Sequence, residues 1–439
     1  MTKQTNLTKS SLLVAGLLLG TLASPAFAGT KALHCGAVLD QPGTNPRGPS
    51  TILVEAGKIT EIRAGLDAVD GAKSVNLKDK FCLPGLIDSH VHLTSELSSK
   101  GRLDAVTHSD ADWAMNAVLH SRRTLMAGFT SVQDVGARGD DAIYAVRDAI
   151  NRGELAGPRI RAAGKTVSVS GGHGDGRHGY SEDIAAALLS PATCDGVDAC
   201  RRAVRENVRR TADVIKITAT GGVLSNTAAG TEQQFFDDEM RDIVIAARLM
   251  GRKVTAHAHG KSGIEAALRA GVSSIEHGTY LDGETIALFK KKGAYLVPTV
   301  LAGATVAIMA DDPNGFLPPA SRAKAKVVGP LMLDMLRRAH QGGVKIAFGT
   351  DSGVSAHGDN AQEFVLMVEA GMTPMQAITA ATVSAADHLE MSAVIGSIEP
   401  GKHADIIAVD GNPLDKIEAL LDVGFVMKGG KVYKNKNTK

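Results

Sequence analysis

The sequence predicts an α/β protein: a (β/α)8 TIM barrel with a small β-sandwich domain built from both ends of the chain. Three observations lead to this prediction. From Pro84 onward, short apolar segments alternate with longer helix-like stretches, which is typical of repeated strand–helix units with parallel strands. About eight such units fill roughly 300 residues, the usual size of this barrel. On both sides of the barrel, short alternating segments punctuated by Gly and Asp predict strands and hairpins.

Residues 1–28 have the composition of a secretory signal peptide. Two lysines supply a basic start, residues 12–23 form an apolar run, and a small-x-small cleavage motif ends at Ala28. The apolar run is short for a membrane span. We expect cleavage after Ala28 and a secreted or periplasmic protein that keeps no membrane attachment. The alternative is a retained N-terminal anchor.

The two chain ends are assigned to one domain and the middle of the chain to another. The composite β-sandwich domain takes residues 29–83 and 389–439, and the catalytic barrel takes residues 84–388. The expected barrel strands lie in the segments GLIDSHVHL, TSVQDVG, RIRAAG, DVIKITA, KVTAHAH, SSIEHG, AYLVPT and KIAFGTD. Helices are expected at 110–127, 195–210, 237–250 and 321–341, and a long Gly- and His-rich loop at 165–192.

Composition and charge are those of a soluble globular protein. The chain is 44% hydrophobic and 22% charged, with a formal net charge of +1. Since no basic stripe is visible, we expect no nucleic-acid partner. In an oxidising compartment the four cysteines are candidates for disulfides. Cys194 and Cys200 would close a small ring, whereas Cys35 and Cys82 would pair only if their strands are neighbours, with free buried thiols as the alternative.

Residues that bind metals recur where the expected barrel strands end, which is where a barrel of this kind builds its active site. His90 and His92 are two residues apart, so both face one side of their strand and can share one ion. Four imidazoles with a carboxylate suit zinc or a similar divalent metal. The strand-end set comprises His90, His92, Lys216, His257, Glu276, His277 and Asp351.

Lys216 stands in the middle of an apolar strand, within Val-Ile-Lys-Ile. Burying an ammonium group costs several kcal/mol unless a partner or a change of charge state removes the cost. Either Lys216 points outward, or its pKa is depressed and the amine is largely neutral. A neutral amine can capture CO₂ as a carbamate, and the two carbamate oxygens can bridge two metal ions.

The motifs resemble those of the metal-dependent amidohydrolase superfamily. Within it, the chain is most similar to the branch that holds Xaa-Pro dipeptidases, imidazolonepropionase-like proteins and ochratoxin-hydrolysing amidases. The matching segments span essentially the whole mature chain: PGLIDSHVHL (84–93), DVIKITATGGV (213–223), AHAHG (256–260), IEHG (275–278), GTDS (349–352) and GSIEPGKHADI (396–406).

The resemblance implies two divalent ions, expected to be Zn²⁺, bridged by Lys216 as N6-carboxylysine. One ion is held by the His-x-His pair, Lys216 and the strand-eight aspartate, and the other by Lys216 with the histidines of strands five and six. In this sequence the implied ligands are His90, His92, Lys216 and Asp351 for the first ion, and Lys216, His257 and His277 for the second.

Further roles follow from the same resemblance. Asp351 would take a proton from the attacking water and pass it to the leaving amine, while His259 would bind the substrate carbonyl. Several relatives have a tyrosine at the position of His259. Substrate-binding candidates are His173 and Arg177 in the long loop, with Arg177 facing a substrate carboxylate, and Val223 in the pocket wall.

Three functions are compatible with the sequence. The first is an exported amidase or dipeptidase that cleaves an amide next to a free carboxylate, such as an Xaa-Pro or Xaa-Arg dipeptide, an N-acyl amino acid or an ochratoxin-like amide. The second is a cyclic-amide hydrolase resembling imidazolonepropionase, and the third is a metal-storage protein. Export favours the first, for which the partner is a small-molecule substrate. The resemblance also implies a homo-oligomer.

Overall fold

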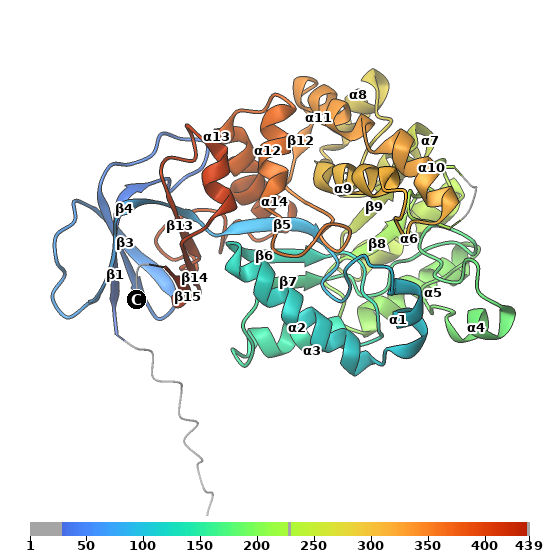
Figure 1. Cartoon of the computed structure of the whole chain (residues 1–439), viewed down its shortest axis with the longest axis horizontal. Coiled ribbons are helices and arrows are strands. Elements are labelled where there is room, and N and C mark those ends of the chain that lie inside the picture. Colours follow the sequence, from blue (N-terminus) through green and yellow to red (C-terminus); the bar gives the residue numbers. More distant parts are fainter. Residues whose placement is uncertain (1–28, 227–229, 437–439) are drawn as a thin grey trace, which may run out of the picture.

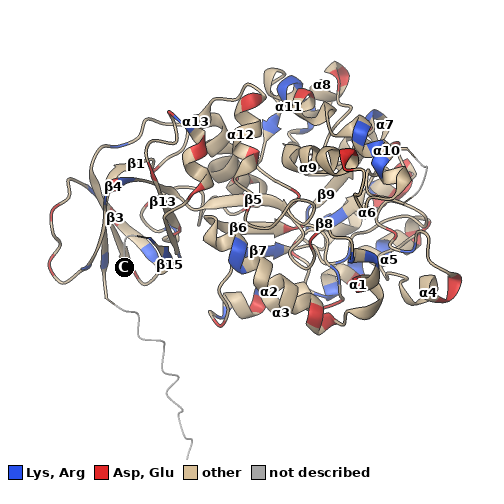
Figure 2. Cartoon of the chain, viewed as in Figure 1, with Lys and Arg blue, Asp and Glu red and all other residues tan. Residues whose placement is uncertain are grey.

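The computed structural model describes residues 29–226 and 230–436, so the expected signal peptide lies outside the described residues. A sheet formed by the chain ends lies beside a larger body of strands and helices (Figure 1). Lys and Arg segments are interspersed with Asp and Glu segments over the helices (Figure 2). Among the described residues, no helix is long and apolar enough to cross a membrane.

Strands from both chain ends form one seven-stranded sheet, in the order β15-β14-β13-β4-β1-β2-β3. The seven-stranded sheet is consistent with the predicted β-sandwich domain, and hydrogen bonds join its strands from both chain ends into one sheet. The pairing of β1 with β4 is parallel and places Val38 opposite Cys82. The strands are β1 (Lys31–Val38), β2 (Ser50–Glu55), β3 (Lys58–Ala64), β4 (Lys73–Pro84), β13 (Ile406–Asp410), β14 (Phe425–Lys428) and β15 (Lys431–Asn435).

This sheet buries both of its faces because its residues alternate. On β13, Ile407 and Val409 join the main core, whereas Ile406 and Ala408 belong to a separate small cluster on the other face. The Cys35–Cys82 disulfide lies in that small cluster, with its Cα atoms 6.0 Å apart. Apolar packing in this cluster therefore holds the two chain ends together, while the disulfide joins two strands of the N-terminal segment.

All eight expected barrel strands are present, and within each of two sheets the neighbouring strands pair in parallel. They form a three-stranded sheet, β5-β6-β7, and a five-stranded sheet, β12-β11-β10-β9-β8. Isolated bridges link the two sheets, from Val91 to Ser352 and from Val167 to Ile217. A fully closed barrel goes beyond these pairings and stays a prediction. The strands are β5 (Leu86–Val91), β6 (Phe129–Asp134), β7 (Arg159–Ala162), β8 (Ile215–Thr218), β9 (Val254–Ala258), β10 (Ser274–His277), β11 (Tyr295–Val297) and β12 (Lys345–Ile346).

Three of the four expected helices are confirmed within one to two residues: α2 (Asp110–Met126), α5 (Val197–Arg209) and α6 (Asp237–Leu249). The fourth, expected at 321–341, is wrong as a single helix. It is divided into α10 (Pro319–Val328) and α11 (Leu331–Gln341), because Gly329 and Pro330 interrupt the helical hydrogen bonds. The expected loop at 165–192 contains a short helix, α4 (Glu182–Ala187), and its end is tied down by the Cys194–Cys200 disulfide.

The remaining helices lie in the segments between and after the barrel strands. They are α1 (Gly101–Thr107), α3 (Ala142–Asn151), α7 (Lys261–Ala270), α8 (Gly283–Lys292), α9 (Val300–Asp311), α12 (Gln362–Glu369), α13 (Pro374–Thr379) and α14 (Ala385–His388), with a π-helical turn at Ala380–Ser384 and a 3₁₀ turn at Ile417–Leu421.

Candidate metal centre and active site

Six of the seven strand-end residues line one cleft of about 590 Å³, and the seventh, Glu276, contacts the His90 ring. His90, Lys216, His257 and His277 lie in β5, β8, β9 and β10, and Asp351 follows β12. All of the ligands predicted from the sequence line this cleft. The parallel direction of the strands brings their carboxyl ends to one side, which explains why residues so distant in sequence converge.

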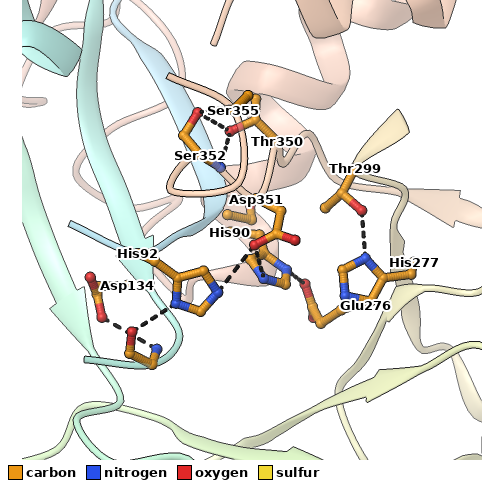
Figure 3. Close-up of polar contacts among 12 residues, drawn as sticks. His90, His92, Asp134, Glu276, His277, Thr299, Thr350, Asp351, Ser352 and Ser355 are labelled. Atoms are coloured by element: carbon orange, nitrogen blue, oxygen red, sulfur yellow. Dashed lines mark hydrogen bonds and ion pairs between the residues drawn. The ribbon is translucent and has the colours of Figure 1, made fainter. Parts of the chain in front are cut away.

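His90, His92 and Asp351 form the first group (Figure 3). The Asp351 Oδ1 atom lies 3.3 Å from His90 Nε2 and 3.1 Å from His92 Nε2. Neither contact has hydrogen-bond geometry, so this buried oxygen has no hydrogen-bond partner in the described chain. Burial would raise the pKa of Asp351, but the two facing histidines hold it well below its usual value.

The outer ring nitrogens of both histidines have acceptors. His90 Nδ1 lies 2.7 Å from the Glu276 carboxylate, and His92 Nδ1 lies 2.7 Å from the Gly136 carbonyl oxygen. A carbonyl oxygen only accepts, so His92 Nδ1 must carry the proton, and in the neutral ring the Nε2 lone pair points at Asp351. Lone pairs facing a carboxylate oxygen are repulsive unless a proton or a metal cation lies between them. The donor set therefore fits a divalent metal.

His257, His259 and His277 form the second group, with ligand atoms within 4.8 Å of one another. Burial is the main cause that lowers the pKa of all three rings, to about 4 for His259 and well below the usual value for His257 and His277. At neutral pH the rings are uncharged, which is the form that binds metals. His277 Nδ1 contacts Thr299 Oγ1 at 2.7 Å, and His257 Nε2 contacts the Gly221 carbonyl oxygen at 3.2 Å.

Lys216 is buried, 3% exposed, and lines the same cleft, close enough to both groups for its charge to disfavour protonation of His90, His257 and His277. Its Nζ atom has no hydrogen bond or ion pair within the described residues. Burial lowers the pKa of Lys216, against the opposing effect of Glu276, Asp351 and Asp134. The outward-facing alternative is therefore excluded, and the amine is held in the environment that carbamate formation requires.

Backbone strain is concentrated in this site. Six described residues other than glycine have a positive φ, and His277, Thr299 and Asp351 are among them, at 73°, 50° and 58°. Left-handed backbone is costly for such residues and persists where the surrounding structure requires it, often at functional sites. For β-branched Thr299 the conformation is a genuine outlier.

Some of the predicted substrate-binding residues line the cleft and one does not. His173 and Val223 line the cleft, and the His173 ring stacks on His257 with ring centroids 4.2 Å apart. Arg177 does not line it, because its guanidinium forms two hydrogen bonds to Asp175, of 2.7 and 2.6 Å. The Asp175–Arg177 spacing is a local signal that would have warned of this pairing.

Several supporting residues were not recognised from the sequence. Asp134, at the end of β6, accepts hydrogen bonds from the Leu93 and Gly136 amides and so fixes the carbonyl that holds His92 (Figure 3). Glu276 had been noted at its strand end but given no role. Thr299 has no sequence signal, because its function depends on the loop after β11.

A third group, Glu96, His120 and His357, also brings possible ligand atoms together. Its two rings stack with centroids 4.3 Å and planes 21° apart. His120 Nδ1 contacts the Leu93 carbonyl oxygen at 2.8 Å, and His357 Nε2 contacts the Ser95 carbonyl oxygen at 3.1 Å. We assign this group no role in the reaction.

Known proteins match most of this chain. The amidohydrolase family profile matches residues 81–433. Ochratoxinase of Aspergillus niger is 35% identical over 371 residues, which cover 80% of this chain and 75% of that enzyme. The crystal structure of a Xaa-Pro dipeptidase with methionine bound in its active site is 41% identical, with a TM-score of 0.88 over 93% of this chain and 100% of that one. Imidazolonepropionase of Salinispora tropica is 24% identical over 382 residues, 82% of this chain and 86% of that enzyme. The chain belongs to the amidohydrolase family, with its TIM-barrel-type fold, and is a hydrolase acting on C–N bonds.

Proposed function

We propose that this protein is an exported binuclear-metal amidohydrolase that cleaves an amide or peptide bond next to a free carboxylate. The observation that carries the proposal is that two ligand groups and a buried Lys216 without a polar partner among the described residues line one cleft. His90, His92 and Asp351 would hold one Zn²⁺, and His257 and His277 the other, with Lys216 shared as N6-carboxylysine. When bound, the ions would supply Lewis acidity and a water of lowered pKa.

The residues of the chain would then move the proton and bind the carbonyl. Asp351 would accept the proton of the attacking water and donate it to the leaving nitrogen. His259 can donate to the carbonyl oxygen only through Nε2, because its Nδ1 is 2.8 Å from Thr279 Oγ1. This requires the Thr279 hydroxyl to donate to Nδ1, which leaves the proton on Nε2.

The cleft also contains an apolar wall on the side of α9, α10 and α11, which would receive an apolar acyl group or side chain. It is made by Val306, Phe316, Leu317, Pro318, Val328 and Met332. Hydrophobic pockets with a few placed polar groups are typical of small-molecule sites. An N-acyl amino acid or a dipeptide with one apolar residue would place its apolar part against this wall and its amide at the ligand groups.

The test is product analysis by mass spectrometry after zinc-loaded mature protein, starting at Gly29, is incubated with a pool of amides. The pool holds Xaa-Pro and Xaa-Arg dipeptides, N-acyl amino acids, ochratoxin A and cyclic amides. We expect two products, an acid and a free amino acid, and none with Lys216→Ala. Ring opening to a single product would replace the proposal with an imidazolonepropionase-like activity, and no hydrolysis by metal-loaded protein would refute the substrate class.

Two further parts of the proposal have their own measurements. Native mass spectrometry of the zinc-loaded protein should show the added mass of one CO₂, absent in Lys216→Ala. N-terminal sequencing of the protein recovered outside the cytoplasm should begin at Gly29. The expected homo-oligomer is tested by light scattering of the purified mature chain.

A further inference from the structure

Four cationic side chains line the cleft, and three of them are already engaged. Arg102 donates to the carbonyl oxygens of His178 and Gly179, at 3.1 and 2.9 Å. Lys165 pairs with Asp140 at 3.2 Å, and Lys216 lies within the metal centre. The fourth is Arg138.

The Arg138 guanidinium has no hydrogen bond and no ion pair with any described residue. It is exposed, and the surface to which it is exposed is the cleft. The surrounding loops desolvate the group and lower its pKa, although a guanidinium remains a cation at any physiological pH. A cation held in a cleft without a counter-ion is suited to an anion that arrives with the substrate.

The main chain at Arg138 is fixed relative to the metal ligands. Its amide donates to Thr94 Oγ1 at 2.7 Å, and Gly136, two residues earlier, accepts from the His92 ring. Consecutive Cα atoms are about 3.8 Å apart, so the Cα atoms of Gly136 and Arg138 are at most about 7.6 Å apart. The side chain extends towards the loop after β7, where a Cβ built on Gly176 would lie 4.0 Å from Arg138 Nη1.

We propose that Arg138 is the residue that selects substrates with a free carboxylate, by forming a bidentate ion pair with that group. The planar fork of arginine matches the two oxygens of a carboxylate, which lysine cannot reproduce. This inference rests on the proposed function, because it names the group that recognises the carboxylate next to the scissile amide. It replaces Arg177, whose guanidinium is occupied by Asp175.

The experiment compares each free-acid substrate cleaved in the pool with its C-terminal carboxamide. Wild type should prefer the acid, and Arg138→Gln should lower kcat/KM for the acid by about 10–100-fold, the usual effect of losing a charged hydrogen bond, while the amide changes less than about twofold. Arg138→Lys should fall in between. Arg122→Gln, an exposed arginine on α2 outside the cleft, is the matched control and should behave as wild type. The zinc content of Arg138→Gln should be unchanged.

A binding measurement separates this inference from the proposed function. In isothermal titration, L-phenylalanine and L-proline should bind the zinc-loaded wild type more tightly than their amides, and Arg138→Gln should remove the difference. If wild type hydrolyses nothing yet binds acids through Arg138, the proposed function fails, whereas the role of Arg138 in binding a carboxylate stands. Equal losses on acid and amide in Arg138→Gln, an unchanged acid preference, or loss of preference only in Arg177→Gln would overturn the inference.

Discussion

The Thr299 hydroxyl is the clearest point at which one metal ion can be weakened without the other. Thr299 Oγ1 donates to the Pro298 carbonyl oxygen at 2.8 Å and contacts His277 Nδ1 at 2.7 Å. Since its hydrogen is used by Pro298, the oxygen accepts from the ring, and this leaves His277 Nε2 free for the metal. Thr299→Val keeps the shape and the β-branch, and therefore the same left-handed strain, while removing the acceptor.

The size of the effect follows from burial, because Thr299 is 0% and His277 6% exposed. An unpaired buried donor costs about 1–3 kcal/mol. The ring can avoid that cost by moving its proton to Nε2, but this tautomer cannot bind the ion. Either way the metal-bound form loses about 1–3 kcal/mol, which corresponds to roughly 10–100-fold weaker binding of the ion held by His257 and His277.

The ion at His90 and His92 should keep its affinity, because those rings are held by Glu276 and Gly136. The assay is stepwise removal of zinc by a chelator, with the zinc remaining on the protein measured by elemental mass spectrometry. Wild type and Thr299→Ser, which retains the hydroxyl, should release both ions over similar chelator ranges, whereas Thr299→Val should lose one much earlier. If Thr299→Val loses both ions together, or neither one earlier than Thr299→Ser, the assigned role of the hydroxyl is refuted.

Three other outcomes are expected. Asp351→Asn should lower turnover by several orders of magnitude while retaining much of the zinc, which parallel activity and elemental analyses would show. His388 is buried with both ring nitrogens unpaired among the described residues, and burial lowers its pKa from 6.5 to about 4. The contribution of neutral His388 to the free energy of unfolding is fully present above pH 6.5, and up to about 3 kcal/mol of it is lost as the pH falls towards 4. The urea concentration at which the metal-free protein unfolds should therefore fall less at low pH in His388→Leu than in wild type. Replacing both cysteines of a disulfide with Ala should lower the free energy of unfolding, measured in urea. The expected loss is about 4 kcal/mol for Cys35–Cys82, which spans 47 residues, and about 2 kcal/mol for Cys194–Cys200, which spans 6.

The strands could be predicted from the sequence because each is a short apolar run bounded by turn residues, as at Ile215–Thr218. The break between α10 and α11 was missed because apolar residues recur at helical spacing on both sides of Gly329-Pro330. Periodicity reports which face is buried, and it does not report whether the backbone is continuous. One β-domain built from both chain ends was predicted, whereas the order of its seven strands depends on contacts between residues far apart in the sequence.

The convergence of the candidate metal ligands in one cleft was predictable because strand ends and the i, i+2 rule restrict where side chains point. Arg138 and Arg177 look alike in the sequence, each in a Gly-rich loop after a barrel strand. What separates them is the occupancy of their guanidinium groups, and this depends on which carboxylates lie nearby after folding. Asp175 neutralises Arg177, while no described carboxylate lies within ion-pair distance of Arg138.

The two ligand groups should also differ in their response to acid. For His90, burial and Lys216 lower the pKa, but Asp351 and Glu276 raise it by more, so the net shift is upward. For His257 and His277 the pKa is lowered well below its usual value, chiefly by burial. A metal must displace a proton from a protonated ring, so falling pH opposes binding at His90 first. Carboxylation of Lys216 would remove one of the effects that lower the pKa of His90, and this would increase the difference in pKa between the two groups.

Zinc retained after dialysis across a pH series should therefore fall in two steps. Thr299→Val should bring the two steps together by weakening the acid-resistant one. A single step in wild type would show that the two ions bind as one unit and that this contrast between the histidines does not control their release.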